Sequence, residues 1–181
     1  MSRSSMHIKL KRSPGIYLAG FMGSGKSTVG TALATALGWD FVDLDKEIEA
    51  AEGESIPSIF DSRGEAEFRR LEREAIRKQV SRIERGAPTV VALGGGAFVE
   101  PGNYELIENH GVTVWLDCSF GEVQRRLTGH EHERPLARDP ARFKLLFDAR
   151  RAGYGRADFR VDGDCDPAAT ASTILALPLW K

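Results

Sequence analysis

The sequence predicts an α/β fold in three layers, with helices on both faces of a parallel sheet. Two observations carry this prediction. Along the 181 residues, short apolar runs alternate with segments of helical periodicity, which is the pattern of repeated β-α-β units. In addition, the glycine-rich segment "GFMGSGKST" at residues 20–28 directly follows the first apolar run, where folds of this class place a phosphate-binding loop.

Five apolar runs are the candidate strands: residues 16–19, 41–44, 89–93, 112–116 and 159–161. The longest helix is expected at residues 65–84, because apolar residues recur there at helical spacing and give one core-facing stripe. Further helices are expected near residues 26–37, 101–109, 120–127, 140–150 and 167–177. Since ligands bind beyond the carboxyl ends of such strands, functional residues should follow these runs.

The composition, with 41% hydrophobic and 28% charged residues, is that of a soluble globular protein. A net charge of −1 gives no bulk attraction to nucleic acid or membranes, and no run reaches the ~20 apolar residues of a membrane span. Two cysteines form no disulfide framework, which favours a reducing, cytoplasmic compartment. We expect residues 1–14 to be a flexible tail and residues 15–181 a single domain.

The segment at residues 20–28 fits the pattern G-x-x-x-x-G-K-S. Such a loop cradles a polyphosphate with its backbone N–H groups, while its lysine reaches the terminal phosphates and its serine binds Mg²⁺. A helix beginning near Lys26 directs the positive end of its dipole at the same anion. The alternative is a glycine-rich turn with an incidental lysine. The residues expected to bind ATP are Gly23, Ser24, Gly25, Lys26, Ser27 and Thr28.

The second apolar run ends in "DLD". The two-residue period of a strand puts Asp43 and Asp45 on the same face, near the phosphates. One carboxylate can then hold Mg²⁺ through water while the other addresses an acceptor hydroxyl. The alternative is that both cap a helix, since "DKEIEA" begins helically.

The third run ends in "LGGG", residues 93–96, which has more glycines than one turn needs. Either a ligand contacts the backbone there, or two backbones pack closely. Arg69 follows the core residue Phe68 on its helix and is rotated from it by about 100°, which puts Arg69 at the edge of the buried stripe. A charge there needs a partner such as a ligand carboxylate or Glu72. The alternative is that Arg69 is solvated.

The segment at residues 128–140, "TGHEHERPLARDP", has no apolar period and is either a mobile lid or an idle surface loop. Its Arg134 stands beside a proline that stiffens the loop. Arg134 can fold over a transferring phosphate, or it is an exposed arginine without a role.

These motifs, in this order, resemble the shikimate kinase family from about residue 15 to the C-terminus. The matching stretches are "GFMGSGKSTVG", "FVDLD", "SIPSIFDSRGEAEFRRLE", "LGGGA", "RPL" and the arginine–tyrosine pair in "RRAGY". Many kinases share the phosphate loop, but the ordered combination is far more specific. The resemblance implies a P-loop fold like that of nucleoside monophosphate kinases, with a five-stranded parallel sheet. It also implies transfer of the ATP γ-phosphate to the 3-hydroxyl of shikimate in aromatic amino acid biosynthesis.

The resemblance also implies residue roles. Lys26 and Ser27 handle phosphates and Mg²⁺, Asp43 supports the metal through water, and Asp45 holds the acceptor hydroxyls. The shikimate carboxylate is gripped by Arg69 and Arg150 with the Gly95 backbone, while Arg134 acts from the lid. Arg126 is the arginine on the adenine side, near the loop "DGDCDP". Where the family has proline or leucine before the motif tyrosine, this chain has Gly153, which leaves Arg151 as an alternative to Arg150.

The expected partners are therefore shikimate and ATP, with no nucleic acid or membrane, and the expected state is a monomer. The nearest alternative function is another small-molecule kinase of the same architecture, such as gluconate kinase, because gluconate also carries a carboxylate and hydroxyls. An alternative from another class is a silent relative that binds a ligand or protein without catalysis.

Overall fold

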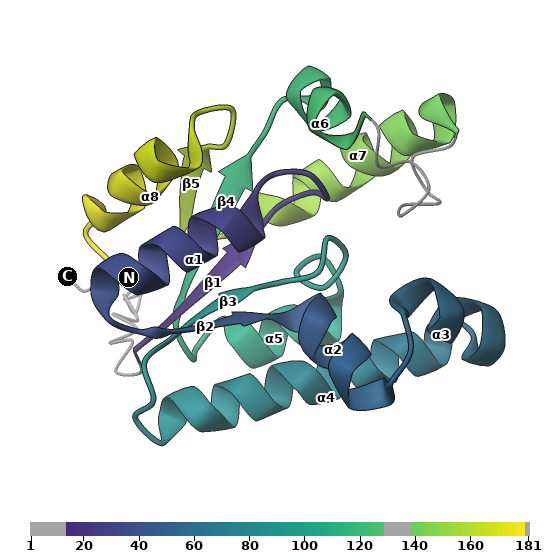
Figure 1. Cartoon of the computed structure of the whole chain (residues 1–181), viewed down its shortest axis with the longest axis horizontal. Coiled ribbons are helices and arrows are strands. Elements are labelled where there is room, and N and C mark those ends of the chain that lie inside the picture. The colour runs from purple at the N-terminus through teal and green to yellow at the C-terminus, as the bar shows by residue number, and fades with distance from the viewer. Residues whose placement is uncertain (1–13, 129–138, 180–181) are drawn as a thin grey trace, which may run out of the picture.

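The structure, a computed structural model, describes residues 14–128 and 139–179 (Figure 1). Its sheet has five parallel strands in the order β2-β3-β1-β4-β5. Their bounds are β1 Gly15–Ala19, β2 Asp40–Asp43, β3 Thr89–Ala92, β4 Val112–Asp117 and β5 Phe159–Asp162. The five-stranded parallel sheet predicted from the sequence is confirmed.

The described residues also form eight helices. Their bounds are α1 Lys26–Leu37, α2 Leu44–Glu52, α3 Ile56–Arg63, α4 Glu65–Glu84, α5 Pro101–Ile107, α6 Phe120–Leu127, α7 Pro140–Tyr154 and α8 Pro167–Leu175. Most agree with the sequence to within a few residues. The largest difference in length is in α7, which runs one turn further than expected, to Tyr154.

Helix α2 was considered only as the capping alternative for Asp43 and Asp45, and helix α3 was not predicted. Ser55 caps its first turn by accepting from the Ser58 N–H at 3.3 Å, and the chain turns away at Gly64. Over its eight residues, only Ile59 is buried. Ile56, Ile59 and Phe60 lie at helical spacing, but three apolar residues within one or two turns are too short a pattern to identify a helix from the sequence.

The residues of β1 alternate between two hydrophobic cores. Ile16 and Leu18 belong to the core that includes residues of α1 and α8, whereas Tyr17 and Ala19 belong to the core that includes residues of α4, α5 and α7. All four side chains are at most 1% exposed. Burial on both faces explains why this strand reads as an unbroken apolar run, and it gives the three layers predicted.

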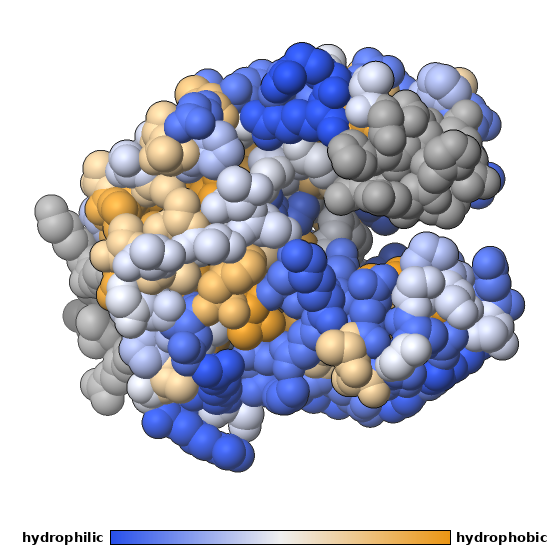
Figure 2. All heavy atoms as spheres, in the orientation of Figure 1, coloured by the Kyte–Doolittle hydropathy of each residue, from blue (hydrophilic) through white to orange (hydrophobic). Residues whose placement is uncertain are grey.

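Because the strands are parallel, the loops after β1, β2 and β3 leave the same edge of the sheet. Figure 2 shows the molecule hollowed on this side, next to α2 and α3. This cleft brings together segments that are far apart in the sequence. Within residues 14–128 and 139–179, no helix is both long and apolar enough to span a membrane.

Candidate active site

The loop between β1 and α1 is held by its own residues. Gly23 (φ 78°) and Gly25 (φ 88°) have left-handed backbones that favour glycine. Lys26 donates from Nζ to the carbonyl oxygens of Gly20 at 2.8 Å and Phe21 at 2.9 Å. Helix α1 begins at Lys26, as predicted, so its first N–H groups are available to an anion in the loop. One continuous segment thus has the backbone and the charge that suit a phosphate.

Ser27, in the first turn of α1, donates its hydroxyl hydrogen bond to Asp43 Oδ2. Asp43 ends β2 and also caps α2, with Oδ1 accepting from the Lys46 N–H at 3.3 Å. The capping alternative is therefore correct for Asp43, and capping leaves its other oxygen beside Ser27. A hydroxyl next to a carboxylate is the kind of oxygen pair that Mg²⁺ prefers, so these residues fit the ion.

The prediction that Asp45 lies on the same face of a strand as Asp43 was wrong. Strand β2 ends at Asp43 and α2 begins at Leu44, so Asp45 lies in the first turn of a helix rather than on a strand. Its carboxylate still faces the glycine run: a Cβ placed on Gly94 would lie 2.6 Å from Asp45 Oδ1. A helical turn, not the pleat of a strand, brings Asp45 to this edge of the sheet.

The glycine run makes room for charged side chains. Neither Gly95 nor Gly96 has a positive φ, so backbone freedom is not the reason for glycine there. A Cβ on Gly96 would lie 3.1 Å from both Nη atoms of Arg69 and 3.2 Å from Arg150 Nη2. A Cβ on Gly95 would lie 3.3 Å from Arg150 Nη1. Two guanidinium groups therefore converge on the backbone of these glycines.

These two arginines come from different helices, α4 and α7. Burial lowers the pKa of Arg150, and the positive charge of Arg69 acts in the same direction. Arg150 also lies over the Phe21 ring, 5.7 Å from its centroid, next to the phosphate loop. Two like charges held close in partly dry surroundings form a site for an anion, and paired guanidinium forks suit a carboxylate.

Glu72 is the protein partner of Arg69. Its Oε2 accepts from Arg69 Nη1 at 2.9 Å and from Asn103 Nδ2 at 3.1 Å, and its side chain is 1% exposed. Burial raises the pKa of Glu72, although Arg69 opposes this effect. Sequence reasoning considered Glu72 but missed Asn103, because nothing in the sequence shows that α5 packs on α4.

Arg151 has a different environment from Arg150. Its Nη2 lies 2.8 Å from Asp117 Oδ2, and its guanidinium lies over the Trp115 ring. Both partners belong to β4. The structure therefore places Arg150 at the glycine run and Arg151 at β4.

Arg126, on α6, joins the phosphate loop to the segment "DGDCDP". Its Nη2 donates to the Gly163 carbonyl at 2.9 Å, and its Nη1 donates to the Gly23 carbonyl at 3.4 Å. Glu122 holds the same guanidinium through Nε at 2.6 Å. This position, beside the glycine-rich loop, suits a role on the nucleotide side.

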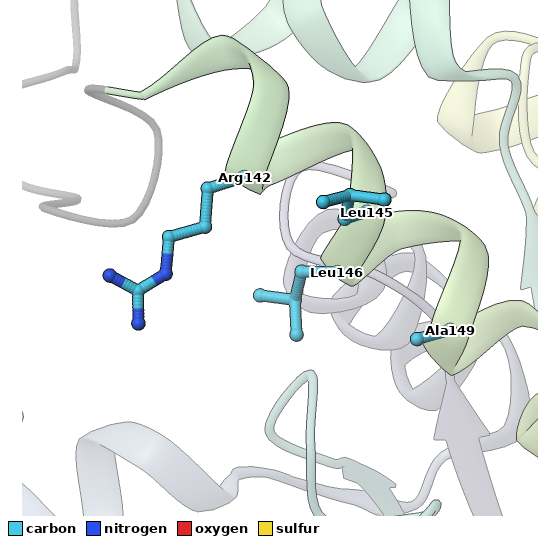
Figure 3. A pocket seen from close by; sticks show the side chains of 4 residues that line it. All are labelled: Arg142, Leu145, Leu146 and Ala149. Atoms are coloured by element: carbon cyan, nitrogen blue, oxygen red, sulfur yellow. The ribbon is translucent and has the colours of Figure 1, made fainter.

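Arg134 and most of the predicted lid, residues 129–138, lie outside the described residues, so their roles stay predictions. The helix that follows, α7, carries a cavity of about 340 Å³ lined by Arg142, Leu145, Leu146 and Ala149. Arg142 and Leu146 extend from the same side of α7 (Figure 3). None of these four residues was predicted to take part in the chemistry.

The chain is similar to known shikimate kinases in sequence and in structure. The sequence profile described as shikimate kinase matches residues 22–177. A shikimate kinase from Sulfurihydrogenibium sp. (strain YO3AOP1) is 45% identical over 82% of this chain and 87% of its own length. The structure of a shikimate kinase from Acinetobacter baumannii in complex with shikimate has a TM-score of 0.83 and is 33% identical, covering 92% of this chain and 93% of that one.

A gluconokinase from Sinorhizobium meliloti 1021 is similar in structure, with a TM-score of 0.55 and coverage of 91% of both chains. Its identity of 22% shows a shared fold and nothing finer. The resemblance inferred from the motifs is confirmed by the profile and by the relatives: the chain belongs to the shikimate kinase family.

Proposed function

We propose that the chain transfers the γ-phosphate of ATP to the 3-hydroxyl of shikimate, giving shikimate 3-phosphate and ADP. The observation that carries the proposal is the convergence of Arg69 and Arg150 on the glycine run, in a cleft shared with the phosphate loop. A bidentate clamp for a carboxylate is what this acceptor requires. Family membership and the shikimate complex of the Acinetobacter baumannii relative support the same acceptor.

On the nucleotide side, the loop residues Gly23 to Thr28 bind the phosphates of ATP, and Arg126 contacts the nucleotide. Ser27 and, through water, Asp43 hold Mg²⁺. The ion, when bound, neutralises charge on the β- and γ-phosphates. Lys26 adds a positive charge beside the terminal phosphates, and its two carbonyl contacts keep its stem in the loop.

On the acceptor side, Arg69, Arg150 and the Gly95 backbone hold the carboxylate, which leaves the hydroxyls of shikimate facing Asp45. Asp45 either takes the proton of the 3-hydroxyl late in the reaction or only orients that hydroxyl. Phosphoryl transfer depends on positioning and charge neutralisation, so the reaction needs no nucleophilic side chain of the protein. Arg134 acts at the transferring phosphate, as its motif predicts.

The proposal includes a cytoplasmic monomer that works on small molecules. Cys118 and Cys165 are free thiols, which suits a reducing compartment. Size-exclusion chromatography with light scattering measures the oligomeric state directly.

A substrate panel tests the function. Purified protein is assayed for ADP release with ATP, Mg²⁺ and either shikimate, quinate, gluconate or a nucleoside monophosphate. We expect shikimate to give the highest kcat/KM and EDTA to abolish turnover. A higher kcat/KM with gluconate would support the alternative kinase, and ATP binding without turnover on any acceptor would support a silent relative.

A further inference from the structure

The last turn of α7 docks closely on the segment that follows β3. A Cβ on Gly153 would lie 2.6 Å from Val99 Cγ1, so only glycine allows this approach. Arg156, just beyond the helix, donates from Nη2 to the carbonyls of Phe98 at 3.3 Å and Val99 at 3.4 Å. The departure from the family pattern at Gly153 therefore coincides with tight packing between α7 and this segment.

Tyr154 extends this docking to the acceptor site. Its hydroxyl donates to the carbonyl oxygen of Gly95, and its side chain is almost fully buried. The ring packs near that of Trp115, with 6.0 Å between centroids. Burial raises the pKa of Tyr154, so the hydroxyl keeps its proton at neutral pH and acts as a donor.

This hydrogen bond fixes a peptide group of the glycine run. The Gly95 carbonyl and the Gly96 N–H belong to one planar trans peptide and point in opposite directions. Anchoring the carbonyl therefore sets the direction of the N–H and the position of both glycines, which lie against Arg69 and Arg150. Arg150 precedes Tyr154 by about one turn on α7, so the same contact sets its distance from the glycines.

We propose that Tyr154 is a positioning residue of the acceptor site: its hydroxyl fixes the Gly95–Gly96 peptide against α7, so that Arg69 and Arg150 converge on the carboxylate of the acceptor. Tyr154 acts through these groups. The inference rests on the proposed function, because it assigns the clamp to the shikimate carboxylate.

Tyr154→Phe tests the proposal, because it keeps the buried ring and removes only the donor. We expect the KM for shikimate to rise about tenfold, the effect of losing one buried hydrogen bond, with the KM for ATP unchanged. Tyr104→Phe is the matched control. The Tyr104 hydroxyl lies in the same docked region, 3.5 Å from the Arg156 carbonyl, and its removal should leave both KM values unchanged.

The methyl ester of shikimate separates positioning from general stability. It lacks the negative charge that the clamp recognises, so the wild type should prefer shikimate strongly over the ester. In Tyr154→Phe this preference for shikimate over the ester should shrink. The Tyr154 hydroxyl positions Arg69 and Arg150, and these are the groups that the substrate carboxylate contacts, so the two changes are not additive. An unchanged preference, or equal increases in the KM values for shikimate and ATP, would overturn the proposal.

A pair of unnatural residues decides the matter if the phenylalanine variant folds poorly. At position 154, 4-aminophenylalanine keeps a donor and should restore the wild-type KM for shikimate, whereas 4-methylphenylalanine fills the same space without a donor and should not. Equal kinetics for these two proteins would contradict the proposal. Failure of the proposed function has a different signature: the wild-type protein itself would not phosphorylate shikimate.

Discussion

The phosphate loop takes its binding groups from one continuous segment, residues 20–28, whereas the acceptor side draws Asp45, Arg69, Gly95 and Arg150 from four separate parts of the chain. The loop is held by left-handed glycines and by contacts of its own lysine. The acceptor side depends on how α2, α4 and α7 dock around the glycine run. Changes in the loop should therefore act on ATP alone, while changes on the acceptor side should act together on shikimate.

Lys26→Ala should have the largest effect, because it removes the positive charge of the loop from the terminal phosphates. We expect kcat to fall about 10³-fold, the scale of losing a transition-state contact to a phosphoryl group. Circular dichroism should show an unchanged fold, since the change removes two side-chain contacts to loop carbonyls and leaves the left-handed glycines of the loop in place. Turnover of shikimate at the wild-type rate would show that the loop has been wrongly assigned.

Arg150→Ala should raise the KM for shikimate about 10²-fold, because the variant leaves a desolvated carboxylate without one of its partners. The KM for ATP should not change. Arg151→Ala is the matched control on the same helix: it loses the contact to Asp117, which Arg160 also makes, and should leave both KM values unchanged. The reverse result would assign the clamp to Arg151.

Arg126→Ala should raise the KM for ATP about tenfold, the scale of one charge-assisted contact, and leave the KM for shikimate unchanged. Arg125→Ala is its control, since Arg125 pairs with the same Glu122 but its side chain is largely exposed. If both variants have the same KM for ATP, Arg126 does not contact the nucleotide.

Glu72→Gln should have the smallest effect, on stability rather than turnover. Burial raises the pKa of Glu72, so its protonated form favours the folded state and that contribution is lost as pH rises through the raised pKa. The wild type should therefore lose stability relative to Glu72→Gln as pH increases from the ordinary carboxyl pKa to above the raised one. Urea unfolding at several pH values measures this difference, and a constant difference would contradict it.

The contrast between the phosphate loop and the acceptor side also explains how much of the site the sequence could predict. The loop was predictable because its motif sets the backbone, the lysine and the start of α1 together. Asp45 was placed on a strand because "DLD" fits strand alternation, but Asp43 caps α2 and ends the strand one residue earlier. The sequence therefore placed Asp45 correctly just beyond the end of β2, but it assigned this residue to a strand when it lies in a helix.

The acceptor side was less predictable for a physical reason. Arg150 and Arg151 are adjacent, and helical periodicity alone could not say which faces the cleft. The structure separates them because Trp115 and Asp117 of β4 hold Arg151. The contact of Tyr154 with Gly95 exists only because α7 docks on the segment after β3, which no motif describes.

The central claim is that Arg69 and Arg150, from two helices, form one clamp on the acceptor carboxylate. Calorimetric titration of shikimate into the wild type, Arg69→Ala, Arg150→Ala and the double variant tests it, with thermal unfolding to check that each is folded. The account predicts that each single change weakens binding about 10²-fold and that the second change adds much less than the first, with ATP binding unaltered throughout. Small, additive losses, or an equal loss of ATP binding, would contradict it.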